Sequence, residues 1–127
     1  MLKTNKRPVF LNLLQIRFPL TAIASILHRI AGVLMIFSIP FLIYLFELSL
    51  RNEGSFMTMS NLLQQPWVSL LMYVLLWAIS HHFFAGIRYF MVDFEWISGR
   101  SASRLSAVIV IVLALSVPAL VFIRNLI

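Results

Sequence analysis

The chain has 127 residues, of which 61% are hydrophobic and only 11% are charged. This composition excludes an ordinary soluble domain and indicates an integral membrane protein. Ten Lys and Arg residues outweigh four acidic residues, so the formal net charge is +6, and the chain has no cysteine. Disulfide bonds and iron–sulfur ligation by this chain are therefore excluded.

Residues 1–20 precede the first long apolar run and are predicted to form a cytoplasmic interfacial arm. Basic residues alternate with hydrophobic ones there, and Pro8 and Pro19 interrupt any continuous helix. We expect the arm to lie along the membrane surface, where it can contact a soluble partner. The first apolar run starts too far from Met1 to be a cleavable signal peptide.

Three apolar runs follow the arm, each close to the ~20 residues that a helix needs to cross a ~30 Å hydrocarbon core. They predict spans over about residues 21–50, 66–91 and 105–125. The fold class is therefore an all-α membrane protein, with residues 1–127 forming a single membrane-anchor domain. The connections, residues 52–65 and 94–104, are predicted to be loops, the former with an amphipathic turn.

Basic residues predict the orientation of these spans. Eight of the ten Lys and Arg residues lie before the first span, in its first turns or around the second connection. Arg51 and Arg124 lie at the opposite ends of the spans. The positive-inside rule then places the N-terminus in the cytoplasm and the C-terminus in the periplasm. Because topology accounts for the positive charge, nucleic-acid binding is not expected. A bacterial cytoplasmic membrane is the expected location.

The first span opens with a polar face near its cytoplasmic end. Ser25, His28, Arg29 and Gly32 are spaced at i, i+3, i+4 and i+7, which places them on one side of a helix. The hydroxyl and guanidinium groups can hold a carbonyl oxygen of a small redox ligand, or the guanidinium can pair with a haem propionate. Alternatively, His28 and Arg29 are interfacial anchors that extend to the lipid headgroups.

The second span carries His81 and His82 in its cytoplasmic half. His82, Gly86, Tyr89 and Asp93 share one helix face. A neutral imidazole is a common ligand of haem iron, and Gly86 leaves room for a flat macrocycle, so we predict that His82 is an axial haem ligand. The alternative is that His82 only forms a hydrogen bond to a neighbouring helix. His81 projects about 100° away from His82, so a second axial ligand must come from elsewhere.

Because the first two spans are antiparallel, the two polar clusters are expected at the same membrane depth. Their motifs, Ser-x-x-His-Arg-x-x-Gly within residues 17–32 and His-x-x-x-Gly-x-Arg within residues 82–93, occur together with three spans. In these features the chain resembles, over nearly its whole length, the cytochrome b membrane-anchor subunits of succinate dehydrogenase. The resemblance implies one half of a heterodimeric anchor bundle.

The resemblance also implies site residues, cofactors and partners. His82 would bind haem b, with the other axial ligand supplied by a second anchor subunit. Ser25 and Arg29 would line the ubiquinone site, and His28 and Arg29 would lie near the haem propionates. An iron–sulfur subunit and a flavoprotein subunit would be the other partners, and electrons would pass from succinate to quinone. This chain alone would catalyse nothing.

Two positions depart from that family's usual pattern. Tyr89 stands where a histidine is common, and His81 stands where a tyrosine is frequent and is a rival for the ligand role. Two other functions remain open. One alternative is that the chain is the anchor of a quinol:fumarate reductase. The other is that it is a cofactor-free membrane scaffold.

Overall fold

The computed structural model describes residues 18–127 and contains, within them, helices α1 (Leu20–Arg51), α2 (Glu53–Leu63), α3 (Pro66–Asp93) and α4 (Arg100–Leu126). Helices α1, α3 and α4 are long and apolar enough to cross a membrane, in agreement with the three predicted spans. The predicted arm lies outside the described residues except for its last three, Phe18, Pro19 and Leu20.

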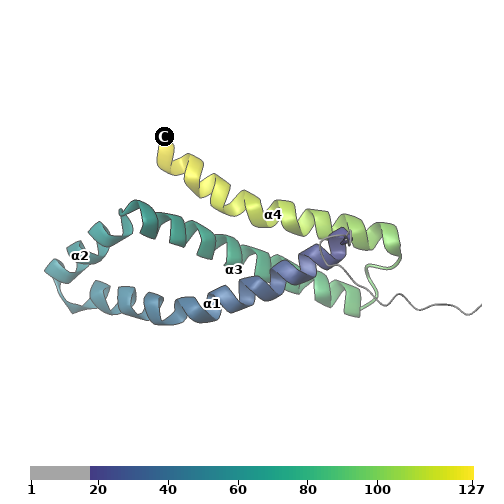
Figure 1. Cartoon of the computed structure of the whole chain (residues 1–127), viewed down its shortest axis with the longest axis horizontal. Coiled ribbons are helices and arrows are strands. Elements are labelled where there is room, and N and C mark those ends of the chain that lie inside the picture. The colour runs from purple at the N-terminus through teal and green to yellow at the C-terminus, as the bar shows by residue number, and fades with distance from the viewer. Residues whose placement is uncertain (1–17) are drawn as a thin grey trace, which may run out of the picture.

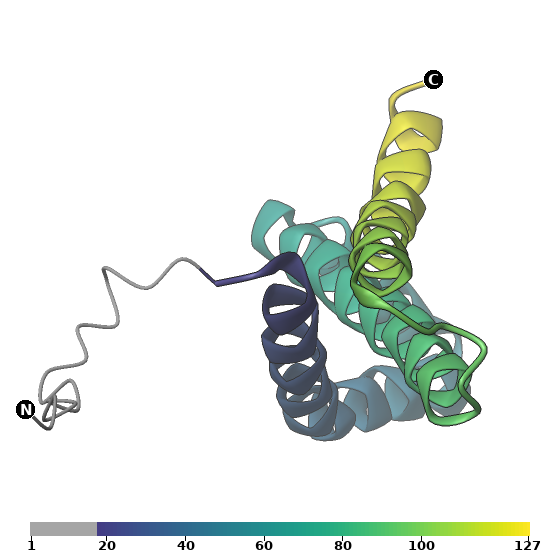
Figure 2. The same cartoon turned by 90° about the vertical axis from the view of Figure 1, so that its right-hand side faces the viewer.

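Helix α3 is the centre of the molecule. It packs against both α1 and α4, and α1 also contacts α4 (Figure 1). Successive long helices run in opposite directions, so the start of α1, the end of α3 and the start of α4 meet at one end (Figures 1 and 2). Helix α2 closes the opposite end. We call the first of these the α1-start end.

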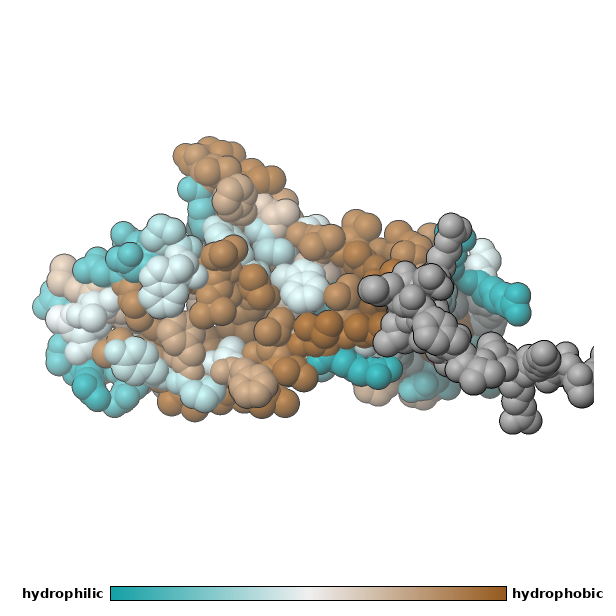
Figure 3. Space-filling model, viewed as in Figure 1, coloured by the Kyte–Doolittle hydropathy of each residue, from teal (hydrophilic) through white to brown (hydrophobic). Residues whose placement is uncertain are grey.

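The surface has the distribution expected for a membrane protein. Hydrophobic side chains dominate the middle of the face seen in Figure 3, and hydrophilic ones gather toward its two ends. Most large apolar side chains of the long helices are exposed, because they face away from the chain's own small core. These side chains are available to lipid or to other membrane helices.

Small side chains hold the long helices close together. The most deeply buried alanines are distributed over all three spans: Ala24, Ala31, Ala78, Ala85, Ala107 and Ala114. Lipid tails are as apolar as the side chains, so helices associate in a membrane through close packing rather than through the hydrophobic effect. Small side chains between the helices allow their backbones to approach closely.

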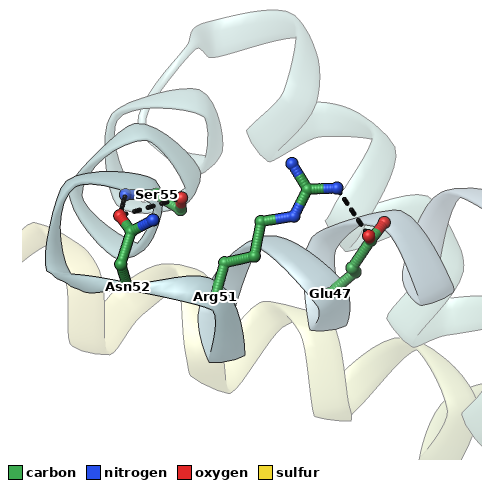
Figure 4. A network of polar contacts seen from close by, with 4 residues as sticks. All are labelled: Glu47, Arg51, Asn52 and Ser55. Carbon is green, nitrogen blue, oxygen red and sulfur yellow. Dashed lines mark hydrogen bonds and ion pairs between the residues drawn. The ribbon is translucent and has the colours of Figure 1, made fainter.

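The two predicted loops are wrong in extent. The first connection contains the 11-residue helix α2, which Asn52 caps by accepting a hydrogen bond from the Ser55 backbone N–H at 2.9 Å (Figure 4). The second span continues to Asp93, and α4 begins at Arg100 rather than at residue 105. Gly99 precedes α4 with a φ of 85°, a left-handed conformation that glycine adopts without strain.

The ends of the spans otherwise follow the sequence. Pro66 occupies the first position of α3, as predicted, where its missing N–H costs no helical hydrogen bond. Glu47 and Arg51, spaced at i and i+4, form an ion pair at 2.6 Å near the end of α1 (Figure 4). Both side chains are exposed, so this pair contributes little to stability.

Replacing a buried alanine with leucine tests this packing. Ala114→Leu should destabilise the helix bundle by about 1–3 kcal/mol, because the site has no space for added methylene groups. The same change at exposed Ala119, five residues further along α4, should have little effect. Unfolding in mixed detergent micelles, followed by circular dichroism, measures both. Equal stability of the two variants would contradict the packing described here.

Candidate functional site

The two predicted polar clusters meet at the α1-start end of the molecule. The rings of His28 and His82 are stacked, with centroids 4.1 Å apart and planes inclined by 17°. Tyr89 lies edge-on to His28, with ring centroids 5.2 Å apart. The convergence expected from the antiparallel spans is therefore confirmed for these side chains.

His82 is held in one tautomer by α1. Its Nδ1 lies 3.3 Å from the backbone carbonyl oxygen of His28. Because a carbonyl oxygen can only accept, Nδ1 must carry the hydrogen, and in the neutral ring Nε2 keeps a free lone pair. The half-buried ring lines a cavity of about 380 Å³ between α1 and α3, whose other walls are largely aliphatic and include Leu75 and Ile79.

Two glycines lie close to His82 and differ in their surroundings. A Cβ atom at Gly32 would come within 3.2 Å of His82 Cε1, so a larger residue there would require the ring to shift by a few tenths of an ångström. A Cβ atom at Gly86 would meet no described atom within 4 Å. Gly86 therefore borders open space, as predicted for the glycine one turn from His82. Gly32 contacts His82, a role that the sequence analysis missed.

His81 faces the interior of the chain. It has 0% exposed surface, and its Nε2 lies 3.3 Å from the carbonyl oxygen of Ala24. Trp77 stacks on the ring with centroids 5.5 Å apart. Its Nδ1 has no hydrogen-bond partner among residues 18–127. An external group reaches neither ring nitrogen unless α1 and α3 separate, whereas His82 borders a cavity.

Ser25 and Arg29 form the outward part of the cluster. Arg29 Nη2 donates to Ser25 Oγ over 3.5 Å, and the Arg29 side chain is exposed. Within the described part of the chain, no carboxylate lies within ion-pair distance of this guanidinium. Its remaining N–H groups have no partner among residues 18–127 and can bind an acceptor outside the chain. This geometry suits both a bound carbonyl or propionate and a lipid headgroup.

Arg88 has a role that the sequence analysis missed. Only 7% of its surface is exposed, and its Nε donates to Ser106 Oγ at 2.9 Å. Its Nη2 donates to the hydroxyl of Ser103 at 3.0 Å and to the carbonyl oxygen of the same residue at 3.3 Å. The available signal was the pair Ser103 and Ser106, spaced at i and i+3 beside the start of the third apolar run.

The fold and the site together define a multi-pass membrane protein that presents histidine, arginine and serine side chains between its spans at one end. The profile of the succinate dehydrogenase/fumarate reductase transmembrane subunit family matches residues 3–122. The chain belongs to this family, which confirms the resemblance noted in its motifs. It is also similar to the succinate dehydrogenase cytochrome b556 subunit of Coxiella burnetii, with 36% identity over 110 residues, covering 86% of this chain and 88% of that protein.

The hydrogen bonds of Arg88 predict a selective effect on stability. Ser106→Ala removes the acceptor of a nearly buried guanidinium and should destabilise the protein by about 1.5–3 kcal/mol. Ser101→Ala is the matched control, because Ser101 is exposed on the same helix. Thermal unfolding of the purified complex in detergent compares them. A Ser106→Ala melting temperature equal to that of Ser101→Ala would rule out a stabilising role for this contact.

Proposed function

We propose that this chain is the haem b-binding membrane-anchor subunit of a succinate dehydrogenase and helps to form its ubiquinone-reduction site. The observation that carries the proposal is the arrangement of His82. Its Nδ1 makes the hydrogen bond to His28, so Nε2 is not used in that bond, and the ring borders an apolar cavity. The name of the Coxiella burnetii relative favours succinate dehydrogenase and a b-type cytochrome. The family includes fumarate reductase subunits as well, so that enzyme is the second candidate.

The residues around His82 fit an axial ligand of haem. A metal-binding histidine commonly donates its other ring N–H to a carbonyl oxygen, which fixes the tautomer and the ring orientation. The carbonyl oxygen of His28 is placed to accept that bond, and the space beside Gly86 leaves room for a planar group. Haem supplies one-electron redox chemistry when bound. We assign the second axial ligand to a second anchor subunit.

His28 and Arg29 are the groups of this chain proposed to lie near the haem propionates. His28 stacks directly on His82, and Arg29 follows it in sequence with an exposed guanidinium. A guanidinium binds a carboxylate through parallel charge-assisted hydrogen bonds. Tyr89 lies against His28, and its side chain is a phenol, which has no cationic form. It therefore contributes no positive charge to such a contact.

Ser25 and Arg29 are proposed to bind ubiquinone. A hydroxyl and a guanidinium one helical turn apart can both donate to one carbonyl oxygen of the quinone ring. The positive charge of Arg29 stabilises the negative charge that develops on this oxygen as the ring accepts electrons. The chain thereby orients the quinone, while the flavoprotein and iron–sulfur subunits deliver the electrons from succinate.

The proposed orientation places the α1-start end in the cytoplasm and the C-terminus in the periplasm. Of the described arginines, those near the α1-start end are Arg29, Arg88, Arg100 and Arg104, and those toward the other end are Arg51 and Arg124. This asymmetry follows the positive-inside rule for a bacterial cytoplasmic membrane. The soluble subunits would dock at the α1-start end, and the second anchor subunit would complete the bundle.

Difference spectra test the ligand assignment. In the purified complex, His82→Leu should abolish the dithionite-reduced minus oxidised b-type signal, because no imidazole remains at the cavity. His81→Leu is the matched control and should retain the haem, since His81 faces the interior. The subunits should copurify in both variants. A wild-type complex without any haem signal would refute the cytochrome assignment and leave a quinone-binding anchor or a scaffold.

Replacing Arg29 separates quinone binding from interfacial anchoring. Arg29→Leu should lower quinone reduction by about 10²-fold or more, since a donor to developing negative charge is lost. Succinate oxidation by a soluble artificial acceptor should remain nearly unchanged. Arg124→Leu, at the far end of α4, controls for loss of a membrane anchor. If Arg29→Leu leaves both activities intact, the residue is an anchor.

A further inference from the structure

We propose that His81 is a positioning residue that sets the orientation of His82 by fixing α3 against α1. This inference rests on the proposed role of His82 as a haem ligand. His81 itself would touch neither the haem nor the quinone.

Two hydrogen bonds between helices carry the inference. His81 Nε2 lies 3.3 Å from the carbonyl oxygen of Ala24, and His82 Nδ1 lies 3.3 Å from that of His28. The donors are neighbours on α3, and the acceptors are four residues apart on α1, which is one helical turn. Each helical carbonyl oxygen has a second lone pair for such a bond.

The two bonds together restrict α3 more than either one does alone. Neighbouring side chains on a helix project about 100° apart, so a single contact still allows α3 to rotate about its axis. Adding a second contact one turn further along α1 opposes this rotation and also fixes the height of α3. The direction of His82 Nε2 then depends on the His81 contact.

The surroundings of His81 leave little slack for an alternative arrangement. The ring has 0% exposed surface and stacks on Trp77. Its Nδ1 is buried and lacks a partner within residues 18–127, which is unfavourable for an imidazole. An aliphatic side chain could fill the same space without burying an unpartnered nitrogen. What histidine adds is the hydrogen bond from Nε2 to the carbonyl oxygen of Ala24.

Small movements of α3 would be felt at His82. The His82 ring is already so close to α1 that a single methyl group at Gly32 would contact Cε1 at 3.2 Å. The Nδ1–H bond to His28, at 3.3 Å, is slightly longer than the usual range for N–H···O hydrogen bonds. Bonds of this kind tune the basicity and orientation of a metal-binding histidine. Losing the His81 bond should therefore change the haem without removing it.

A pair of amide substitutions tests the proposal in the intact complex. His81→Gln places an amide nitrogen near the position of the imidazole Nε2 and should keep the bond to Ala24. His81→Asn is one methylene shorter and cannot reach that oxygen. His81→Met, which has similar bulk but no donor, is a second variant without the bond in case the asparagine variant does not assemble.

Haem content, the midpoint potential and the electron paramagnetic resonance spectrum of the oxidised haem are the readouts. The glutamine variant should match wild type in all of them. The asparagine and methionine variants should retain haem but change its oxidised-to-reduced ratio at a fixed ambient potential by about tenfold, the order of the smaller effects on metal affinity or activity when a group that orients a metal ligand is lost. That change corresponds to about 59 mV for one electron.

The possible failures are distinguishable. If wild type holds haem through His82, and if every assembled variant that lacks the bond has the wild-type potential and resonance spectrum, only the positioning role is overturned. If the haem survives His82→Leu but is lost in all His81 variants, then His81 is the ligand and both proposals fail. A wild-type complex without haem refutes the proposed function before His81 is considered.

Discussion

The close contact between α1 and α3 is the constraint on which the other features of the site depend. Ala24 and Ala31 on α1 and Ala78 and Ala85 on α3 are almost completely buried, and they add little bulk to the interior of the bundle. The two backbones therefore approach closely enough for imidazole rings to reach carbonyl oxygens across the gap. In the membrane interior no water competes for those oxygens, so each such hydrogen bond is strong and helps to fix the orientation of its ring.

The third span stabilises the same end of the molecule by different means. Arg88 extends from α3 toward α4. Its N–H groups donate hydrogen bonds to the hydroxyl groups of Ser103 and Ser106 and to the backbone carbonyl oxygen of Ser103. A buried guanidinium is costly unless its donors are satisfied, so Ser103 and Ser106 must stay in place for α3 to keep its position. Helix α4 therefore contributes more than apolar bulk, and one of its two serines, Ser103, precedes the predicted start of the span.

The polar face of α1 divides into two sides with different contacts. His28 stacks on His82 and Gly32 contacts the same ring, so both belong to the contact with α3. Arg29 is exposed and takes Ser25 as its neighbour. Adjacent helical positions point about 100° apart, and one helix can thus support the proposed haem ligand with one side and offer donors to a quinone with the other. The proposed haem and quinone functions need no additional element of the fold.

Much of this protein was determined by its sequence alone. The length and composition of the apolar runs predict three spans, and the spacing of Ser25, His28, Arg29 and His82 carries the family resemblance. Only the tertiary structure decided that His81 is enclosed while His82 borders a cavity, and that Arg88 is buried against α4. Periodicity is a local property that assigns each residue to a side of its own helix. Packing between helices decides which side faces which neighbour, and at what distance. That packing involves residues far apart in the sequence, so local patterns do not reveal it.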